Sequence, residues 1–374
     1  MIYFDNGATT FPKPDSVISA VESFLREMGG NPSRSSHKLS RMAGEEVYKA
    51  REAVARLLRI DTPENVVFTY NATYALNMAI KSMVRERCHI ICSDVEHNSV
   101  IRPIKALEER LGVEYSVFDS DISPEIAIPQ LIRADTKFII STLSSNVTGK
   151  EMDLFALSRV SDKCSLRLIV DASQSVGHKK IDLSRCPCDA LCAPGHKALF
   201  GIQGSGFVYF KNGLREGEFI EGGSGTNSLD PRMPIWLPEA YEAGTLGTPA
   251  IVALRHGIEF IEEIGLDNIE YHLNKLRSRA YEGLKLIKGV SVYKTDGGIA
   301  LFNLAGMDSN ELSYLLDKKG VCVRGGLHCA PSAHRKLSTL DTGAVRLSFS
   351  IMNTEKEIDE FLAIMENIAK KHKK

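Results

Sequence analysis

The chain has 374 residues, of which 25% are charged and 43% hydrophobic, and its formal net charge at pH 7 is -1. This balance is typical of a globular protein with one large domain or two domains, and it gives no reason to expect nucleic acid as the main partner. The first residues do not resemble a signal peptide, and no apolar run approaches the roughly 18 residues that a transmembrane helix needs. We therefore expect a cytoplasmic protein that binds neither nucleic acid nor membranes.

Helical and strand patterns alternate along the first two thirds of the chain. Apolar residues at helical spacing predict helices near residues 17–28 and 47–58. Short apolar runs predict strands at residues 66–68, 89–92, 137–140, 167–170, 189–192 and 206–210. Strands that are apolar along nearly their whole length, with helices between them, indicate a mostly parallel sheet covered by helices on both faces.

The remaining residues indicate a smaller α/β unit. Apolar residues at helical spacing from Ile251 to Ile264 predict a long helix, which Gly265 interrupts. The later elements are a helix at 269–287, a strand at 300–304, a helix at 309–318, strands at 320–323 and 345–349, and a helix from 354. We interpret residues 15–250 as a large domain and residues 251–374, together with residues 1–14, as a small domain.

Eight cysteines occur without an export signal, so reduced thiols are expected. Cys186, Cys188 and Cys192 lie close together in the sequence and raise the question of a metal site. Their spacing is not that of a C-x2-C pair, and no second such pair is present. We therefore expect buried or surface thiols and no metal.

Lys197 and Asp171 carry the most specific chemistry in the chain. Asp171 ends one predicted strand, and Lys197 follows the next. A lysine amine can form a Schiff base with pyridoxal phosphate (PLP), and a carboxylate can keep the pyridine nitrogen of PLP protonated. Each residue has an ordinary alternative, a helix cap for Asp171 and a surface position for Lys197. Together they predict a PLP site.

Three further polar residues follow predicted strands. Thr73 begins a helix whose free N–H groups suit a phosphate, although an ordinary cap by Asn71 or Thr73 is the alternative. His97 could stack on the PLP ring or simply be exposed, and Asn146 could bind the phenolic oxygen or form a turn with Gly149. Because ligands collect at the carboxyl edge of parallel sheets, we expect these residues to meet Lys197 and Asp171 there.

Over nearly its whole length the sequence resembles a fold-type I PLP enzyme of the class V aminotransferase superfamily, and more narrowly a cysteine desulfurase of the second type, or a selenocysteine lyase. The match begins at residues 4–10 and ends at residues 345–348. Its most discriminating stretch, residues 323–330, resembles the R-x-G-x-H-C-A loop of those desulfurases. The resemblance implies an α/β fold with a mostly parallel large domain. It also implies that Cys329 takes the sulfur of L-cysteine as a persulfide.

The same resemblance implies the roles of the other site residues. Lys197 binds PLP, His97 stacks on its ring, Asp171 and Gln174 contact the ring nitrogen and phenolic oxygen, Asn146 supports substrate and ring, Arg346 grips the substrate carboxylate, and Thr73, the Ala72 backbone and His196 bind the phosphate. Thr245 resembles a threonine that reaches the phosphate of the partner subunit, with Thr248 as an alternative, so a homodimer is expected.

Two positions near the site depart from the family pattern. Pro194 stands two residues before His196, where a hydroxyl residue usually binds the phosphate. The loss of that donor is worth about 1–2 kcal/mol if nothing replaces it. Leu327 stands before His328, where some relatives have two histidines, and this could alter substrate preference. Gly325 and the glycine after it predict a loop that can carry a persulfide outward.

Three alternatives remain open at this point. The scaffold also suits a selenocysteine lyase acting on L-selenocysteine, or an aminotransferase that needs a keto acid. A non-catalytic regulatory protein that binds PLP is the third, and the presence of Lys197, Asp171, His97, Arg346 and Cys329 together argues against it. The sequence does not identify the protein that accepts the sulfur.

Overall fold

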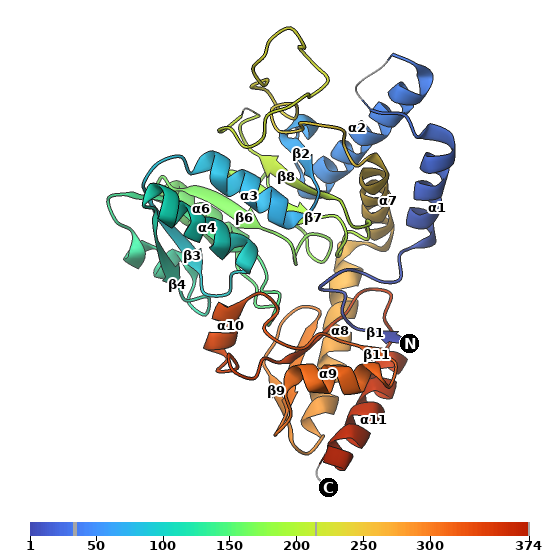
Figure 1. Ribbon diagram of the computed structural model, residues 1–374. Coiled ribbons are helices and arrows are strands. Elements are labelled where there is room, and N and C mark those ends of the chain that lie inside the picture. Colours follow the sequence, from blue (N-terminus) through green and yellow to red (C-terminus); the bar gives the residue numbers. More distant parts are fainter. Residues whose placement is uncertain (33–35, 214, 373–374) are drawn as a thin grey trace.

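The computed structural model describes residues 1–32, 36–213 and 215–372 (Figure 1). Its centre is a seven-stranded sheet in the order β2-β8-β7-β6-β5-β3-β4. The strands are β2 (Val66–Thr69), β3 (His89–Ser93), β4 (Glu114–Phe118), β5 (Thr136–Thr142), β6 (Arg167–Asp171), β7 (Ala190–Pro194) and β8 (Gly206–Phe210). Strands β4, β3, β5, β6 and β7 run parallel, and β8 is antiparallel to β7 and β2. The predicted mostly parallel sheet is therefore confirmed.

Helices cover both faces of this sheet. Alternate residues along a strand point to opposite faces, and Ile90 and Ile91 accordingly belong to two different apolar clusters. Helices α3 (Ala72–Met83) and α4 (Asn98–Leu111) pack on one face, and α2 (Lys38–Leu58), α6 (Leu154–Lys163) and α7 (Thr248–Ile264) contribute to the core on the other. The other helical elements before β5 are the α-helices α1 (Asp15–Ser23) and α5 (Pro124–Ala127), a π-helical turn (Phe24–Met28) and 3-10 turns at Pro63–Asn65 and Pro129–Leu131.

The C-terminal elements form a second, smaller layer below the large sheet in Figure 1. Strand β10 (Ile299–Leu304) lies between β9 (Val290–Tyr293) and β12 (Val345–Ser348) and is antiparallel to both. The helices are α8 (Leu266–Lys285), α9 (Ser309–Asp317), α10 (Pro331–Lys336) and α11 (Glu355–His372). Strand β1 (Ile2–Tyr3) pairs in parallel with β11 (Val321–Cys322), so the N-terminus lies among C-terminal elements. The domain boundary near residue 250 stays a prediction and falls inside α7.

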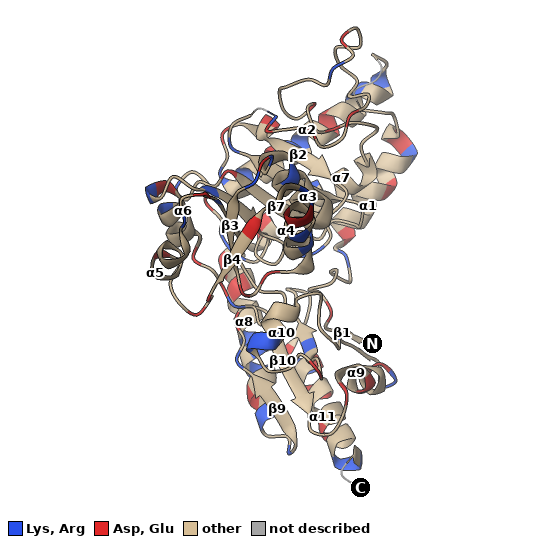
Figure 2. Ribbon diagram, turned by 60° about the vertical axis from the view of Figure 1, so that its left-hand side comes forward, with Lys and Arg blue, Asp and Glu red and all other residues tan. Residues whose placement is uncertain are grey.

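Basic and acidic residues are interspersed over both layers in Figure 2. One ion-pair cluster joins the layers beside α10, where Nζ of Lys336 lies 2.8, 2.6 and 2.8 Å from carboxylates of Asp94, Asp119 and Asp121. These aspartates belong to the loops that follow β3 and β4. Within the described ranges no helix is long and apolar enough to cross a membrane. In the same ranges no cluster of three His, Cys, Asp or Glu side chains is arranged to hold a metal ion.

Gly257 on α7 allows this helix to approach the loop that follows Lys197. A Cβ at Gly257 would lie 1.9 Å from the carbonyl oxygen of Leu199, whereas a Cβ at Gly44 inside α2 would have no atom within 4 Å. We expect Gly257→Ala to lower the free energy of unfolding by about 1–3 kcal/mol or more through overpacking. Gly44→Ala should raise it by about 0.5–1 kcal/mol, because alanine favours the helix. Urea unfolding measures both, and effects of the same sign would contradict this packing argument.

Candidate active site

A cavity opens at the carboxyl edge of the seven-stranded sheet, where β2, β3, β5, β6 and β7 all end. It is lined by Asn71, Ala72, Thr73, His97, Ser99, Thr142, Ser144, Asn146, Asp171, Ser173, Gln174, Pro194, His196 and Lys197. All the predicted site residues are in this set except Thr245, Cys329 and Arg346. The shared strand direction therefore brings the predicted side chains together as expected.

The cavity lowers the basicity of Lys197. Removal of its amine from water lowers the pKa of Lys197 to about 8, and the guanidinium groups of Arg346 and Arg324 act in the same direction. The carboxylate of Asp171 opposes this shift. Asp171 is 3% exposed, and its Oδ1 accepts a hydrogen bond from the backbone N–H of Ser173 at 2.9 Å. A lysine that is easily made neutral, beside a fixed carboxylate, matches the pair that the sequence predicts.

The N-terminal segment holds the backbone around Lys197. The hydroxyl of Thr10 donates to the carbonyl oxygen of Lys197 at 3.0 Å, and that of Thr9 donates to the carbonyl oxygen of His196 at 3.1 Å. Nζ of Lys13 also donates to His196, at 3.0 Å. No role for these three residues follows from the motifs. The match of residues 4–10 to the family was the only signal that this segment reaches the site.

His97 is a neutral ring at the start of α4. Its Nδ1 accepts from the backbone N–H of Ser99 at 3.0 Å, so the neutral ring carries its proton on Nε2. Burial lowers the pKa of His97 to about 4. The hydroxyl of Ser99 lies 2.7 Å from Oγ1 of Thr73, which links the ring to the start of α3. The exposed-loop alternative for His97 is therefore wrong, because the ring is half-buried and caps a helix.

Unpartnered polar groups gather at the α3 end of the cavity. The N-cap Asn71 accepts from Tyr74, which leaves the backbone N–H groups of Ala72 and Thr73 without an acceptor in the described part of the chain. Nδ1 of His196 is buried and has no hydrogen-bond partner there either. Burial lowers the pKa of His196 to about 4. A helix N-terminus with free N–H groups beside an unpaired imidazole suits a phosphate.

Arg346, on the small sheet, does not line the cavity but contacts Asn146 in its wall. Its guanidinium is fully buried, with Nη2 2.7 Å from Oδ1 of Asp5 and Nη1 donating to the carbonyl oxygen of Asn146 at 2.9 Å. Nε has no partner among the described residues. A Cβ at Gly7 would lie 3.1 Å from the guanidinium, so glycine leaves the space in front of it open. The free Nε suits the carboxylate that the resemblance assigns to Arg346.

The loop that carries Cys329 is attached to the cavity wall. The carbonyl oxygen of His328 accepts from Nδ2 of Asn146 at 2.7 Å, and that of Cys329 accepts from the N–H of Asn98 at 2.8 Å. Cys329 is exposed, and Nη2 of Arg324 lies 3.8 Å from its Sγ. The glycines before it predict a loop that moves outward. In the structure both carbonyl groups are hydrogen-bonded, and the outward movement of the loop stays a prediction.

Thr245 is a predicted site residue, and Glu96 is a buried residue that the motifs did not predict. Thr245 does not reach this cavity, and its hydroxyl accepts from Nδ2 of Asn31 at 3.2 Å. Its contribution to a partner subunit stays a prediction. Glu96 was not predicted, yet it is fully buried behind His97, where its Oε1 accepts from Ser93 at 2.5 Å and from the N–H of Thr142 at 2.8 Å. Burial raises the pKa of Glu96 to about 8.

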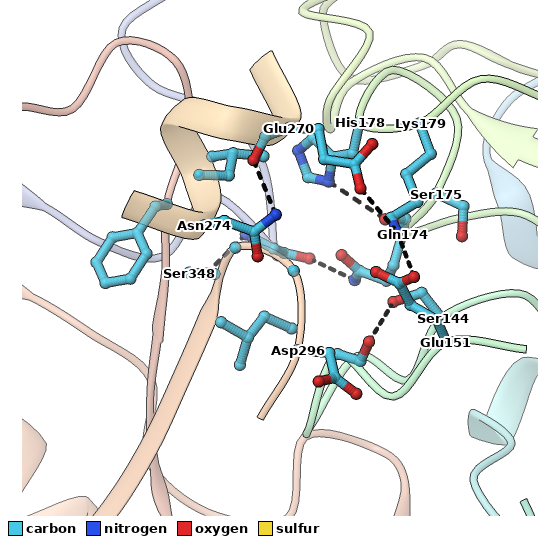
Figure 3. A pocket seen from close by; sticks show the side chains of 17 residues that line it. Ser144, Glu151, Gln174, Ser175, His178, Lys179, Glu270, Asn274, Asp296 and Ser348 are labelled. Carbon is cyan, nitrogen blue, oxygen red and sulfur yellow. Dashed lines mark hydrogen bonds and ion pairs between the residues drawn. The ribbon is translucent and has the colours of Figure 1, made fainter. Parts of the chain in front are cut away.

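A second cavity adjoins the first (Figure 3). Ser144 and Gln174 line both cavities. Nε2 of Gln174 donates to the carbonyl oxygen of Gly7 at 3.1 Å, which ties the loop after β6 to the N-terminal segment. Across this cavity Nζ of Lys179 lies 3.1 Å from Oε1 of Glu270 on α8. The second cavity therefore lies where the large sheet, the N-terminal segment and the C-terminal layer meet.

The similarity to known proteins covers both the residues of the cavity and the loop that carries Cys329. The model of the Aminotransferase class-V family matches residues 2–361. A probable cysteine desulfurase from Methanothermobacter thermautotrophicus is 30% identical over 381 residues, which cover 98% of this chain and 94% of that protein. One from Xylella fastidiosa (strain 9a5c) is 31% identical over 390 residues, 99% of this chain and 91% of that protein. The apo structure of cysteine desulfurase from Thermococcus onnurineus NA1 matches with a TM-score of 0.90 at 30% identity, covering 99% and 94% of the two chains.

Glu96 should make stability fall as pH rises. Its pKa of about 8 in the folded protein lies above the ordinary glutamate value of 4.5, so the folded state holds a proton that the unfolded state loses between these values. Glu96→Gln keeps the accepting oxygen and removes the titration. We expect the stability of this variant relative to wild type to increase by on the order of a few kcal/mol from pH 4.5 to 8, in urea unfolding at several pH values. Glu45→Gln on the exposed side of α2 is the control. A difference in stability between Glu96→Gln and wild type that is constant with pH would contradict the raised pKa of Glu96.

Proposed function

The chain belongs to the aminotransferase class-V family, and from this premise we propose that it is a cysteine desulfurase that converts L-cysteine to L-alanine and takes the sulfur on Cys329. One observation carries the proposal. The loop bearing Cys329 is hydrogen-bonded to Asn146, which lines the cavity that contains Lys197 and Asp171, and to Asn98, which lies between the lining residues His97 and Ser99. A nucleophilic sulfur is thus held at the mouth of a site suited to amino-acid chemistry.

The donor set of the cavity fits PLP. The unpartnered N–H groups of Ala72 and Thr73 and the imidazole of His196 would hold its phosphate, Asp171 would hold its ring nitrogen, and Lys197 would hold it covalently. When bound, PLP supplies an electron sink that weakens bonds at the α- and β-carbons of an amino acid. The buried polar atoms without partners in the cavity support this assignment, because such atoms are rare unless a ligand completes them.

The residues of the chain position the substrate and move its protons. The free Nε of Arg346 binds the substrate carboxylate, in the space that Gly7 leaves open. Nζ of Lys197, with its pKa lowered to about 8, takes a proton from the α-carbon and can return it. His97 remains neutral and would stack on the PLP ring, with its Nε2–H available as a donor.

The atoms and electrons of the sulfur-transfer step balance without an external oxidant. The thiolate of Cys329 attacks the sulfur of L-cysteine, so a sulfur–sulfur bond forms and the bond between Cβ and sulfur breaks. The electron pair of the broken bond stays on Cβ, which takes a proton and becomes the methyl group of L-alanine. One thiol and one molecule of L-cysteine thus give one persulfide and one molecule of L-alanine.

We propose a cytoplasmic homodimer. The family resemblance, which implies that Thr245 reaches the phosphate of the partner subunit, supports the dimer, as does the absence of Thr245 from the lining of its own cavity. A sulfur acceptor protein of unknown identity then collects the persulfide from Cys329. Because Cys329 is exposed, the acceptor protein can reach its sulfur from the surface.

Cys329→Ala separates the desulfurase from its rivals. Selenium can leave the substrate without an enzyme thiol, so the variant should keep its rate on L-selenocysteine, which serves as the control for an intact cavity. On L-cysteine we expect alanine formation, measured with reductant present, to fall about 100-fold or more, because the sulfur has no positioned acceptor. A variant with the wild-type rate on L-cysteine would exclude Cys329 as acceptor. Amino transfer that depends on a keto acid would instead indicate an aminotransferase.

Pro194→Ser should restore a phosphate donor. Pro194 ends β7 and lines the cavity, but it offers no hydroxyl and no N–H. One added hydrogen bond of about 1–2 kcal/mol corresponds to PLP bound about 5 to 30 times more tightly. Fluorescence titration of the cofactor-free protein measures this change. Pro187→Ser, at an exposed proline, controls for the lost rigidity, and equal affinities would show that another group already supplies the donor.

A further inference from the structure

A chain of buried hydrogen bonds runs through the base of the Cys329 loop. Nε2 of His328 lies 3.1 Å from the carbonyl oxygen of Arg324, and Nδ1 of the same ring lies 3.0 Å from Nε2 of His334. Nδ1 of His334 lies 2.8 Å from Oγ1 of Thr339. The side chains of His328, His334 and Thr339 belong to residues that are at most 2% exposed, and the two rings are within 11° of parallel. These hydrogen bonds connect the start of the Cys329 loop to α10, the helix that follows the loop.

One arrangement of protons satisfies every contact in this chain. A carbonyl oxygen can only accept, so Nε2 of His328 donates to Arg324 and its Nδ1 is an acceptor. Nε2–H of His334 then donates to His328, and Nδ1 of His334 accepts from the hydroxyl of Thr339. Burial lowers the pKa of His328 to about 2 and also lowers that of His334, so both rings stay neutral. Neither ring is free to exchange protons with the cavity, which points to a structural task.

The loop needs such a restraint because its backbone is strained. His328 has φ of +52° and Cys329 has φ of +57°, in the left-handed region that non-glycine residues adopt at a cost of roughly 1–2 kcal/mol each. The backbone hydrogen bonds to Asn146 and Asn98 hold the two carbonyl groups of this strained pair. Nothing in those two bonds fixes the side chain of His328, which only the chain through His334 holds from the α10 side.

We propose that His334 is a positioning residue for sulfur transfer, which fixes the ring of His328 and through it the backbone that places Sγ of Cys329. The inference rests on the proposed function, since sulfur transfer is the step that requires this placement. Loss of the His334 donor leaves the buried Nδ1 of His328 unpaired, and the strained pair can then relax. A displacement of about 1 Å is enough to lower the rate of an aligned reaction about 100-fold.

Two substitutions at His334 distinguish a role in positioning the Cys329 loop from a role in the stability of the protein. His334→Leu removes the donor to His328, and His334→Gln keeps an N–H near the place of Nε2. The matched control is His89→Leu, because His89 is equally buried and its ring makes two hydrogen bonds, at 2.8 and 2.9 Å, at the opposite edge of the large sheet. Two measurements are made on the PLP-loaded proteins: persulfide and alanine formation from L-cysteine, and amide hydrogen exchange of Asn98, whose N–H donates to Cys329.

We expect His334→Leu to lower kcat 10- to 100-fold with KM for L-cysteine within about twofold, because Arg346 and Asp171 are untouched. Exchange at Asn98 should become at least about tenfold faster, and His334→Gln should recover most of both effects. The inference falls if His334→Leu changes kcat and exchange no more than His89→Leu does. If the wild-type protein makes no alanine from L-cysteine, the proposed function fails, while the exchange at Asn98 still decides whether His334 holds the loop.

Discussion

The buried guanidinium of Arg346 joins the three parts of the chain that form the cavity. It lies on β12 of the small sheet, pairs with Asp5 from the N-terminal segment, and donates to Asn146 in the loop after β5. A guanidinium that is fully buried requires a paired charge, because an uncompensated charge in the interior is strongly destabilising. The Asp5 pair therefore draws the N-terminus into the site. The same segment then supplies the hydroxyl of Thr10 that holds the carbonyl oxygen of Lys197.

Sequence patterns predicted the central strands and most cavity residues for one physical reason. The central strands are buried on both faces, so they read as apolar runs, and polar residues directly after them necessarily gather at one edge. Strand β4 was missed because it is an edge strand, with Glu114 exposed and a mixed pattern behind it. Glu96 and Lys13 were missed because part of what they do is to bond to backbone groups of distant residues. A hydrogen bond to a carbonyl or an N–H leaves no requirement on the residue type at the other end.

The glycines before Cys329 have a packing role that the motif alone does not reveal. Glycine is expected in flexible loops, and Gly325 and Gly326 predicted movement. In the structure a Cβ at Gly325 would lie 2.4 Å from the carbonyl oxygen of Ser309, and Gly326 has φ of +93°. These glycines therefore permit close packing against α9 and a left-handed turn, both of which fix the loop. The sequence alone does not separate the two uses, because both select for the missing side chain.

Burial without compensation sets the protonation of the whole site. Desolvation lowers the pKa of Lys197 to about 8 and that of His97 to about 4, and Asp171 only partly opposes both shifts. The imidazole is therefore neutral throughout the range in which most proteins work, whereas the lysine changes charge inside it. Under the proposed function, Lys197 rather than His97 would exchange the proton at the α-carbon, because only the lysine changes charge in this range. The ring of His97, neutral and engaged through Nδ1 in the cap of α4, would then contact the PLP ring.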